Sequence, residues 1–167
     1  MRITTEMIKR LREETGAGVM DAKRALEEAD GDMAKAKAIL KERGIAAAAK
    51  KSERATNQGL VEAYIHAGGR IGVLVEVNCE TDFVAKTQNF QQLARDIAMQ
   101  VAAMQPLVVD IGQRTPDMEG SDEEVALLAQ PFIRDGSRTI GDLVKEAIAT
   151  TGENIRVARF SRFELGG

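Results

Sequence analysis

The sequence predicts an α+β protein: an N-terminal three-helix bundle followed by an antiparallel sheet with helices packed on one face. Three short amphipathic patterns, separated by glycine-containing turns, fill about the first 45 residues. An alternating apolar pattern interrupted by Gly68 and Gly69 then predicts a β-hairpin, because both central positions of such a turn favour glycine. Amphipathic helices follow the hairpin, so the chain is predicted to form two parts with separate cores.

The bundle is predicted from start and stop signals as well as from periodicity. A first helix over 4–14 has Thr4 as its N-cap, and a second helix covers 19–29. Asp32 is placed to cap a third helix, which Gly44 is expected to end. Three short helices make a thin core, so we expect the bundle to work tethered to the rest of the chain.

A change of composition separates the two predicted parts. The alanine run at 46–49 is followed by lysines and then by a helix-breaking Thr-Asn-Gln-Gly stretch at 56–59. We therefore expect a bundle at 1–45, a linker at 46–58 and an α+β core at 59–167.

The hairpin strands alternate in hydrophobicity. Val61, Ala63 and Ile65 share one face of the first strand, and the return strand carries apolar residues on one face with Leu74 on the other. Leu74 predicts that the second face of the sheet is also partly covered.

The remaining elements are predicted from amphipathic spacing and caps. A clear helix has its periodic apolar residues between Phe90 and Val101 and is expected to end at Pro106, and another helix ends at Gly152. Ser121 and Glu124 form a capping box for a short helix expected to run to Pro131.

The chain closes on a β-rich run at 155–165, in which Phe160 falls on the opposite parity from Phe163 and Leu165. Either a β-bulge or a strand facing two layers explains that shift.

Composition narrows the class of protein. The net charge is −3, and the modest excess of basic residues near the N-terminus is interleaved with acids, so direct nucleic-acid binding is not expected. Cys79 is the only cysteine, which excludes an internal disulfide and suits a reducing compartment. Neither a signal peptide nor a run of about 18 apolar residues is present. We expect a cytoplasmic protein that does not bind membranes.

The sequence is poor in catalytic groups. There is no P-loop, and Gly16-Ala17-Gly18 lacks the third glycine of a dinucleotide fingerprint because Asp21 stands there. His66 and Cys79 have no ligand spacing around them that predicts a metal site. We therefore expect a binding or regulatory protein, without a cofactor or catalytic site of its own. A small-molecule enzyme remains an alternative.

The segment at 81–84 carries the most specific chemistry. Thr81, Asp82, Phe83 and Val84 follow an apolar strand and set an acid beside a large aromatic. One hypothesis is a surface wedge, in which the aromatic enters an apolar pocket on a partner and the acid meets charge. The alternative is that Phe83 anchors the core at the start of the next helix, with Asp82 as its cap.

Three motifs together resemble the elongation factor Ts family. They are LREETGAGVMDAKRAL at 11–26, NCETDFVAK at 78–86 and GENIRV at 152–157. The resemblance extends over essentially the whole chain. Members of that family are guanine-nucleotide exchange factors for the translational GTPase elongation factor Tu, and their N-terminal bundle resembles a ubiquitin-associated domain.

The resemblance implies roles for particular residues. Phe83 would occupy an apolar pocket of the GTPase, Asp82 would disturb its Mg²⁺ coordination, and Thr81 and Val84 would shape the turn. GDP would then leave and GTP would rebind.

In the bundle, Val19, Met20 and Lys23 would grip the nucleotide-binding domain of the GTPase. The alternatives are that Val19 and Met20 belong to the bundle core and that Lys23 lies on a solvated face. A different class of function, an adaptor whose bundle binds ubiquitin-like or other partners, would not need Asp82 and Phe83.

The chain resembles the short class of the family, in which a homodimer can replace a second core subdomain. Some short members link their dimer through a C-terminal cysteine, but the tail at 163–167 has none. Any homodimer is therefore expected to be non-covalent, with the closing strand as a candidate sheet edge.

Overall fold

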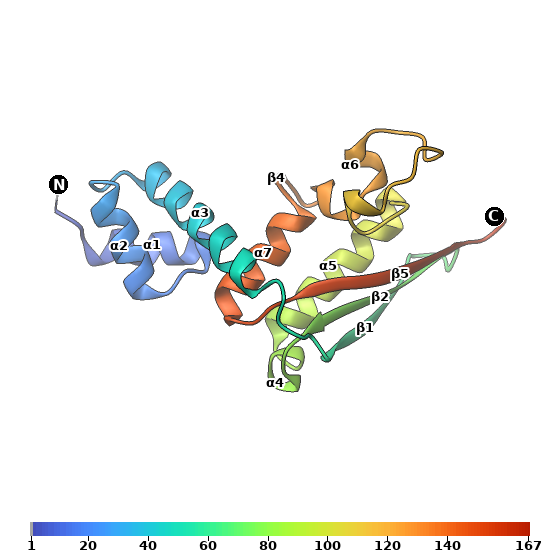
Figure 1. Ribbon diagram of the computed structural model, residues 1–167, viewed down its shortest axis with the longest axis horizontal. Helices are drawn as coiled ribbons and strands as arrows, with labels where there is room; N and C mark the ends of the chain where they lie inside the picture. The colour runs from blue at the N-terminus through green and yellow to red at the C-terminus, as the bar shows by residue number, and fades with distance from the viewer. Residues whose placement is uncertain (1) are drawn as a thin grey trace.

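The N-terminal bundle is built from three helices around a small core. The computed structural model describes residues 2–167. Helix α1 covers Thr5–Thr15, α2 covers Val19–Glu28 and α3 covers Met33–Lys51 (Figure 1). Thr4 and Asp32 cap α1 and α3 as predicted. Leu11 and Leu26 are fully buried, and the other fully buried residues here are alanines.

Helix α3 is longer than predicted and joins the two parts of the molecule. Gly44 does not end it; the helix continues to Lys51, so the first half of the expected linker is helical. The reason is tertiary contact, because α3 packs along α7 (Ile140–Thr151). A Cβ placed on Gly44 would lie 3.7 Å from the Cβ of Ala149, and Ala48 is buried in the core of the second part.

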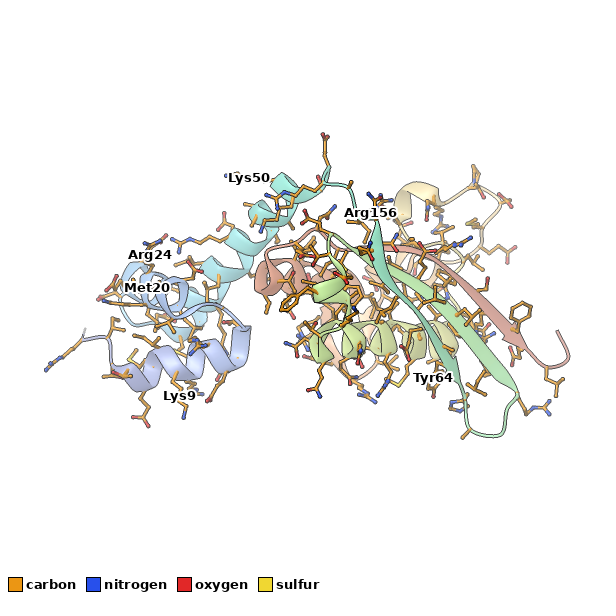
Figure 2. The ribbon with its side chains drawn as sticks, turned by 90° about the horizontal axis from the view of Figure 1, so that it is seen from below. Lys9, Met20, Arg24, Lys50, Tyr64 and Arg156 are labelled. Carbon is orange, nitrogen blue, oxygen red and sulfur yellow. The ribbon has the colours of Figure 1, made fainter. Side chains whose placement is uncertain are left out.

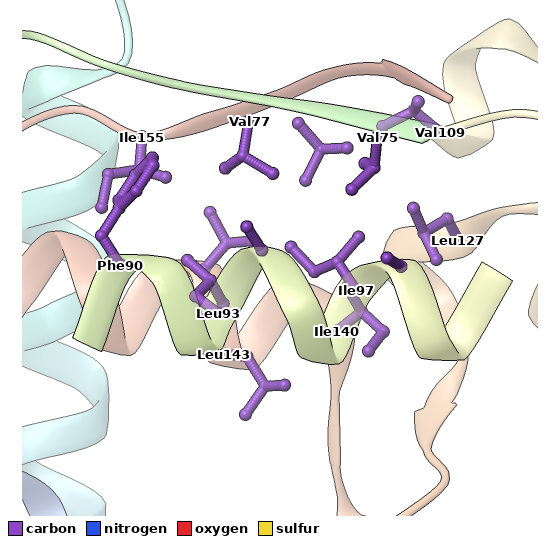
Figure 3. Close-up of a cluster of buried hydrophobic side chains, with 14 of the residues drawn as sticks. Val75, Val77, Phe90, Leu93, Ile97, Val109, Leu127, Ile140, Leu143 and Ile155 are labelled. Atoms are coloured by element: carbon purple, nitrogen blue, oxygen red, sulfur yellow. The ribbon is translucent and has the colours of Figure 1, made fainter. Parts of the chain in front are cut away.

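The second part is organised around an antiparallel sheet of three strands. These are β1 (Gln58–Ile65), β2 (Ile71–Cys79) and β5 (Arg156–Glu164), in the order β1-β2-β5. Helix α5 (Gln88–Met104) covers one face of the sheet, and α7 lies on the far side of α5. Figure 3 shows side chains of β2 facing those of α5, with residues of α7 beyond. The predicted α+β class, with a helical bundle first, is confirmed.

Smaller elements complete the core. Helix α4 covers Asp82–Ala85, and α6 covers Asp122–Val125 behind the predicted capping box. The short helix was expected to run to Pro131, and that is wrong. After α6 the chain forms a 3-10 turn and then a hairpin, which the sequence did not predict. The segments not yet given are the 3-10 turns Ile111–Gln113 and Leu127–Ala129, and the strands β3 (Pro131–Phe132) and β4 (Asp135–Thr139).

The two faces of the sheet differ sharply. Val73, Val75 and Val77 of β2 point into the core, whereas Leu74 is half exposed, so among residues 2–167 nothing provides the cover over the outer face that Leu74 had suggested. The face shared by Val61, Ala63 and Ile65 is also the outer one. The outer face carries an apolar patch of Val61, Ile65, Leu74 and Phe163, all at least half exposed, beside the ion pair of Glu76 with Arg159.

A bulge in β5 resolves the parity shift seen in the sequence. Arg159 pairs with Glu76 and Val157 pairs with Val77, which leaves Ala158 as an extra residue. The bulge puts Phe160 on the core side together with Val157, and regular alternation over the next three residues then turns Phe163 outward.

The hairpin turn is also longer than the predicted two residues. The N–H of His66 donates to the carbonyl of Ile71 at 2.9 Å, so four residues lie between this pair, although Gly68 and Gly69 have the predicted positive φ of 94° and 69°. Within residues 2–167 no helix is long and apolar enough to cross a membrane.

Candidate partner-binding site

The segment at 81–84 turns the chain outward at the end of β2. Thr81 is the N-cap of α4, and its hydroxyl accepts a hydrogen bond from the N–H of Val84 at 3.3 Å. Val84 is buried under this turn, whereas Phe83 is 78% exposed. The alternative in which Phe83 anchors the core and Asp82 is the cap is therefore wrong. A fully displayed phenylalanine on a one-turn helix is a ready anchor for an apolar pocket on a partner.

Asp82 stands beside Phe83 and also faces solvent. Its carboxylate accepts a hydrogen bond from the ammonium of Lys86 at 3.2 Å, and both side chains are mostly exposed. An exposed pair one helical turn apart contributes little to stability, about 0.3–0.5 kcal/mol. The carboxylate can therefore leave Lys86 and interact with a positive charge on a partner, at little cost in the stability of the fold.

A carboxylate that the sequence did not single out holds this turn. Glu153, in the turn between α7 and β5, accepts hydrogen bonds from the N–H groups of Glu80 and Thr81 at 3.1 and 3.0 Å. It also accepts one from the hydroxyl of Thr81 at 2.7 Å. No local pattern predicts such a contact between residues so distant in the chain; the only signal was the position of Glu153 inside the 152–157 motif.

Cys79 lies under the same turn as a buried thiol. It is fully buried, and burial together with the negative charge of Glu153 raises the pKa of the thiol. Its Sγ–H donates to the carbonyl of Thr81 at 3.1 Å. The thiol therefore stays protonated and packs the base of the turn.

His66 does not take part in this site. It lies on the β1–β2 turn, where its ring nitrogen Nδ1 is 3.0 Å from the hydroxyl of Tyr64. In the described part of the chain, no three side chains of His, Cys, Asp or Glu gather as a metal ion would require.

A second exposed surface lies at the start of α2. Val19 and Met20 are 49% and 56% exposed, so the alternative that they belong to the bundle core is wrong. The buried face of α2 is formed by Ala22, Ala25 and Leu26. Lys23 is also exposed on this helix, and its ammonium lies 3.8 Å from Glu27.

The structure does not bring the two groups of predicted residues together. Figure 1 shows α2 on the bundle and α4 at the edge of the core, well apart, and Figure 2 shows Met20 far from the sheet hairpin that carries Tyr64. The two helices rest on separate hydrophobic clusters: Val84 of α4 belongs to that of the second part, whereas α2 packs on that of the bundle through Ala22, Ala25 and Leu26. The candidate site therefore consists of two separate surfaces, joined through α3 and α7.

This combination is typical of a protein-binding factor that contacts its partner at two places. Comparison with known proteins shows the family. The family model described as Elongation factor TS matches residues 13–117. Elongation factor Ts of Carboxydothermus hydrogenoformans is 53% identical, with 98% of this chain and 89% of the relative aligned. That of Coprothermobacter proteolyticus is 47% identical, with 99% and 100% aligned. The chain belongs to the elongation factor Ts family.

Proposed function

We propose that this protein promotes the release of GDP from elongation factor Tu, so that GTP can rebind. The observation that carries the proposal is the exposed side chain of Phe83, on a turn whose backbone is hydrogen-bonded to Glu153 through the N–H of Thr81. The family and the names of the relatives support the choice of partner. A partner in translation also supports a location in the cytoplasm.

The wedge, residues 81–84, would act on the Mg²⁺ site of the GTPase. Phe83 enters an apolar pocket, and this brings the carboxylate of Asp82 close enough to disturb the Mg²⁺ coordination. Because Mg²⁺ bridges the nucleotide phosphates and the protein, its displacement removes a large part of the hold on GDP. The coupling is reciprocal, so nucleotide rebinding expels the exchange factor in turn.

The energetics call for a second contact. Weakening nucleotide binding by about 10⁴ needs about 5.5 kcal/mol of differential binding. A single interface hot spot typically accounts for about 2–4 kcal/mol when truncated. Val19, Met20 and Lys23 on α2 supply the second contact in this proposal, and their exposure is what supports it.

The homodimer is proposed on the outer face of the sheet rather than at the edge formed by β5. The side chains of Val61, Ile65, Leu74 and Phe163 lie exposed together on that face, which no other segment of residues 2–167 covers. Two copies packed face to face would bury it. Sedimentation should show a concentration-dependent dimer, and Leu74→Lys should yield a monomer, whereas Gln91→Lys on the opposite layer should not.

The decisive test is the release of a fluorescent GDP from elongation factor Tu. We expect release to accelerate with increasing concentration of this protein and to saturate. If the protein binds the GTPase without accelerating release, it is an adaptor and the proposal is wrong.

A further inference from the structure

The turn between α7 and β5 reaches across the core to the base of the wedge. One carboxylate, that of Glu153, accepts three hydrogen bonds there. Its Oε1 accepts from the N–H groups of Glu80 and Thr81 at 3.1 and 3.0 Å, and its Oε2 accepts from the hydroxyl of Thr81 at 2.7 Å. Hydrogen bonds to a charged acceptor are about twice as strong as those between neutral groups.

The carboxylate is itself held in place. Glu80 returns the contact, because its carboxylate accepts from the N–H of Asn154 at 2.7 Å. Asn154 is 2% exposed, and its side-chain amide donates to the carbonyls of Ser52 and Arg54 at 3.3 and 2.9 Å. The turn that carries Glu153 is therefore tied both to the end of β2 and to the segment that follows α3.

The wedge depends on this support because α4 is short. A helix of one turn has too few internal hydrogen bonds to hold its own conformation. The direction in which Phe83 points is set by the backbone of residues 80 and 81, from which α4 starts. Those are the two residues whose N–H groups Glu153 binds.

We propose that Glu153 is a positioning residue for the wedge. It keeps the backbone at residues 80–81 in the conformation that presents Asp82 and Phe83 to the partner, and it does not itself contact the GTPase. The proposal rests on the proposed exchange function. It predicts that loss of Glu153 lowers the maximal rate of GDP release more than it weakens binding of the GTPase.

The kinetic test compares variants in the full-length chain. Glu153→Ala should lower the maximal rate constant of fluorescent-GDP release about 10-fold. Glu153→Gln should recover most of the rate, since its amide oxygen can accept from both N–H groups and its amide N–H can donate to the Thr81 hydroxyl. Glu146→Ala, which removes a carboxylate of α7 that accepts a hydrogen bond from Arg138 of β4, is the matched control and should keep the full rate.

A double-variant background separates positioning from general stability. If Glu153 acts through the wedge, Glu153→Ala should cause no further loss of rate when Asp82 and Phe83 are both alanine. Its effect on the melting temperature should be the same in both backgrounds. An equal loss of rate in both backgrounds, or a wild-type rate for Glu153→Ala, overturns the proposal. Should Glu153→Ala fail to fold, Glu153→Asp, which keeps the charge but draws it back by one methylene, carries the same test.

Amide hydrogen exchange tests the turn without the GTPase. The N–H groups of Glu80 and Thr81 should exchange at least 10-fold faster in Glu153→Ala and near the wild-type rate in Glu153→Gln. Unchanged protection would overturn the proposal whatever the kinetics show. If instead the wild-type protein fails to accelerate GDP release while these amides lose protection, the exchange function is wrong and the support of the turn by Glu153 stands.

Discussion

The wedge and the start of α2 are alike in composition but differ in how they are held. Each exposes apolar side chains beside a charge: Phe83 beside Asp82 in the wedge, and Val19 and Met20 near Lys23 on α2. The wedge sits on buried residues of the larger core, is capped by Thr81 and is bound by Glu153. Helix α2 begins at a glycine N-cap that makes no side-chain hydrogen bond, over a core made largely of alanine.

That difference predicts a division of labour. A preorganised side chain loses little conformational entropy on binding, so more of its binding energy can be used to change the conformation of the partner. A surface that is held less rigidly is expected to contribute mainly to affinity. We expect the wedge to set the maximal rate of GDP release and α2 to set the strength of binding. The predictions below test this division, from the largest expected effect to the smallest.

Replacing Phe83 should have the largest effect. Phe83→Ala is expected to lower the maximal rate of GDP release about 30- to 150-fold, as for a hot-spot side chain worth about 2–3 kcal/mol. Because Phe83 is 78% exposed, the free energy of unfolding should change by less than about 0.5 kcal/mol. Stopped-flow release and urea unfolding measure the two quantities.

Phe90 provides the matched control for that change. It is the same residue type one element later but is 2% exposed in the core. Phe90→Ala should destabilise the fold by about 3–5 kcal/mol. If Phe83→Ala instead lost a similar amount of stability, Phe83 would have a structural role after all.

The charge of Asp82 should matter through Mg²⁺. Asp82→Ala and the isosteric Asp82→Asn should each lower the release rate about 10-fold in excess Mg²⁺, because both lack the charge that disturbs the ion. When a chelator removes Mg²⁺, both variants should match the wild type. Full activity of Asp82→Asn, or a defect that persists without Mg²⁺, would contradict a role for this charge at the ion.

Changes on α2 should weaken binding and leave the maximal rate intact. Val19→Ala combined with Met20→Ala is expected to raise the concentration for half-maximal release about 10-fold, in line with two partly exposed contact residues. Lys9→Ala, an exposed change on α1, serves as the control. A fall in the maximal rate equal to that of Phe83→Ala would abolish the distinction between the two surfaces.

Acid should weaken the contact between α1 and α3 in the bundle. Hydrogen bonds from Lys37 on α3 and Arg10 on α1 lower the pKa of Glu14, and its ion pair with Lys37 links α1 to α3. A lowered pKa in the folded state gives stability above the unfolded pKa of about 4.3, and that stability is lost as the pH falls through the folded value.

Bundle resonances followed by NMR in moderate urea should therefore weaken below about pH 4. Glu14→Gln should remove this part of the pH dependence. An unchanged acid response in that variant would assign it to other carboxylates.

Much of the fold could be predicted because its signals are local. The N-caps at Thr4 and Asp32, the capping box at Ser121 and the stop at Gly152 lie where predicted, since a cap depends on residues three or four apart. The prediction that Gly44 ends α3 was wrong because a contact distant in the chain decides the outcome there. A glycine is a weak stop signal, and contact with α7 outweighed it.

The candidate site was predictable as a position but not as a geometry. Asp82 and Phe83 were singled out from their order in the chain, yet sequence alone left open whether Phe83 points inward or outward. The structure decides this. Helix α4 has a single turn, and its inward side is occupied by the buried Val84, so Phe83 points into solvent. Which face of the sheet lies outside was open in the same way, since β1 has apolar residues on both faces: Val61 and Ile65 lie outside, whereas Leu60 packs against the core.

By itself, the sequence determined the element order, the caps, the α+β class and the motif that names the family, because each depends on neighbouring residues or on a contiguous pattern. Only the tertiary structure decided how far α3 extends, which apolar side chains remain in solvent, and that Glu153 binds Thr81. Those outcomes depend on contacts between segments distant along the chain, such as the 72 positions that separate Thr81 from Glu153, and chain order does not encode such contacts locally.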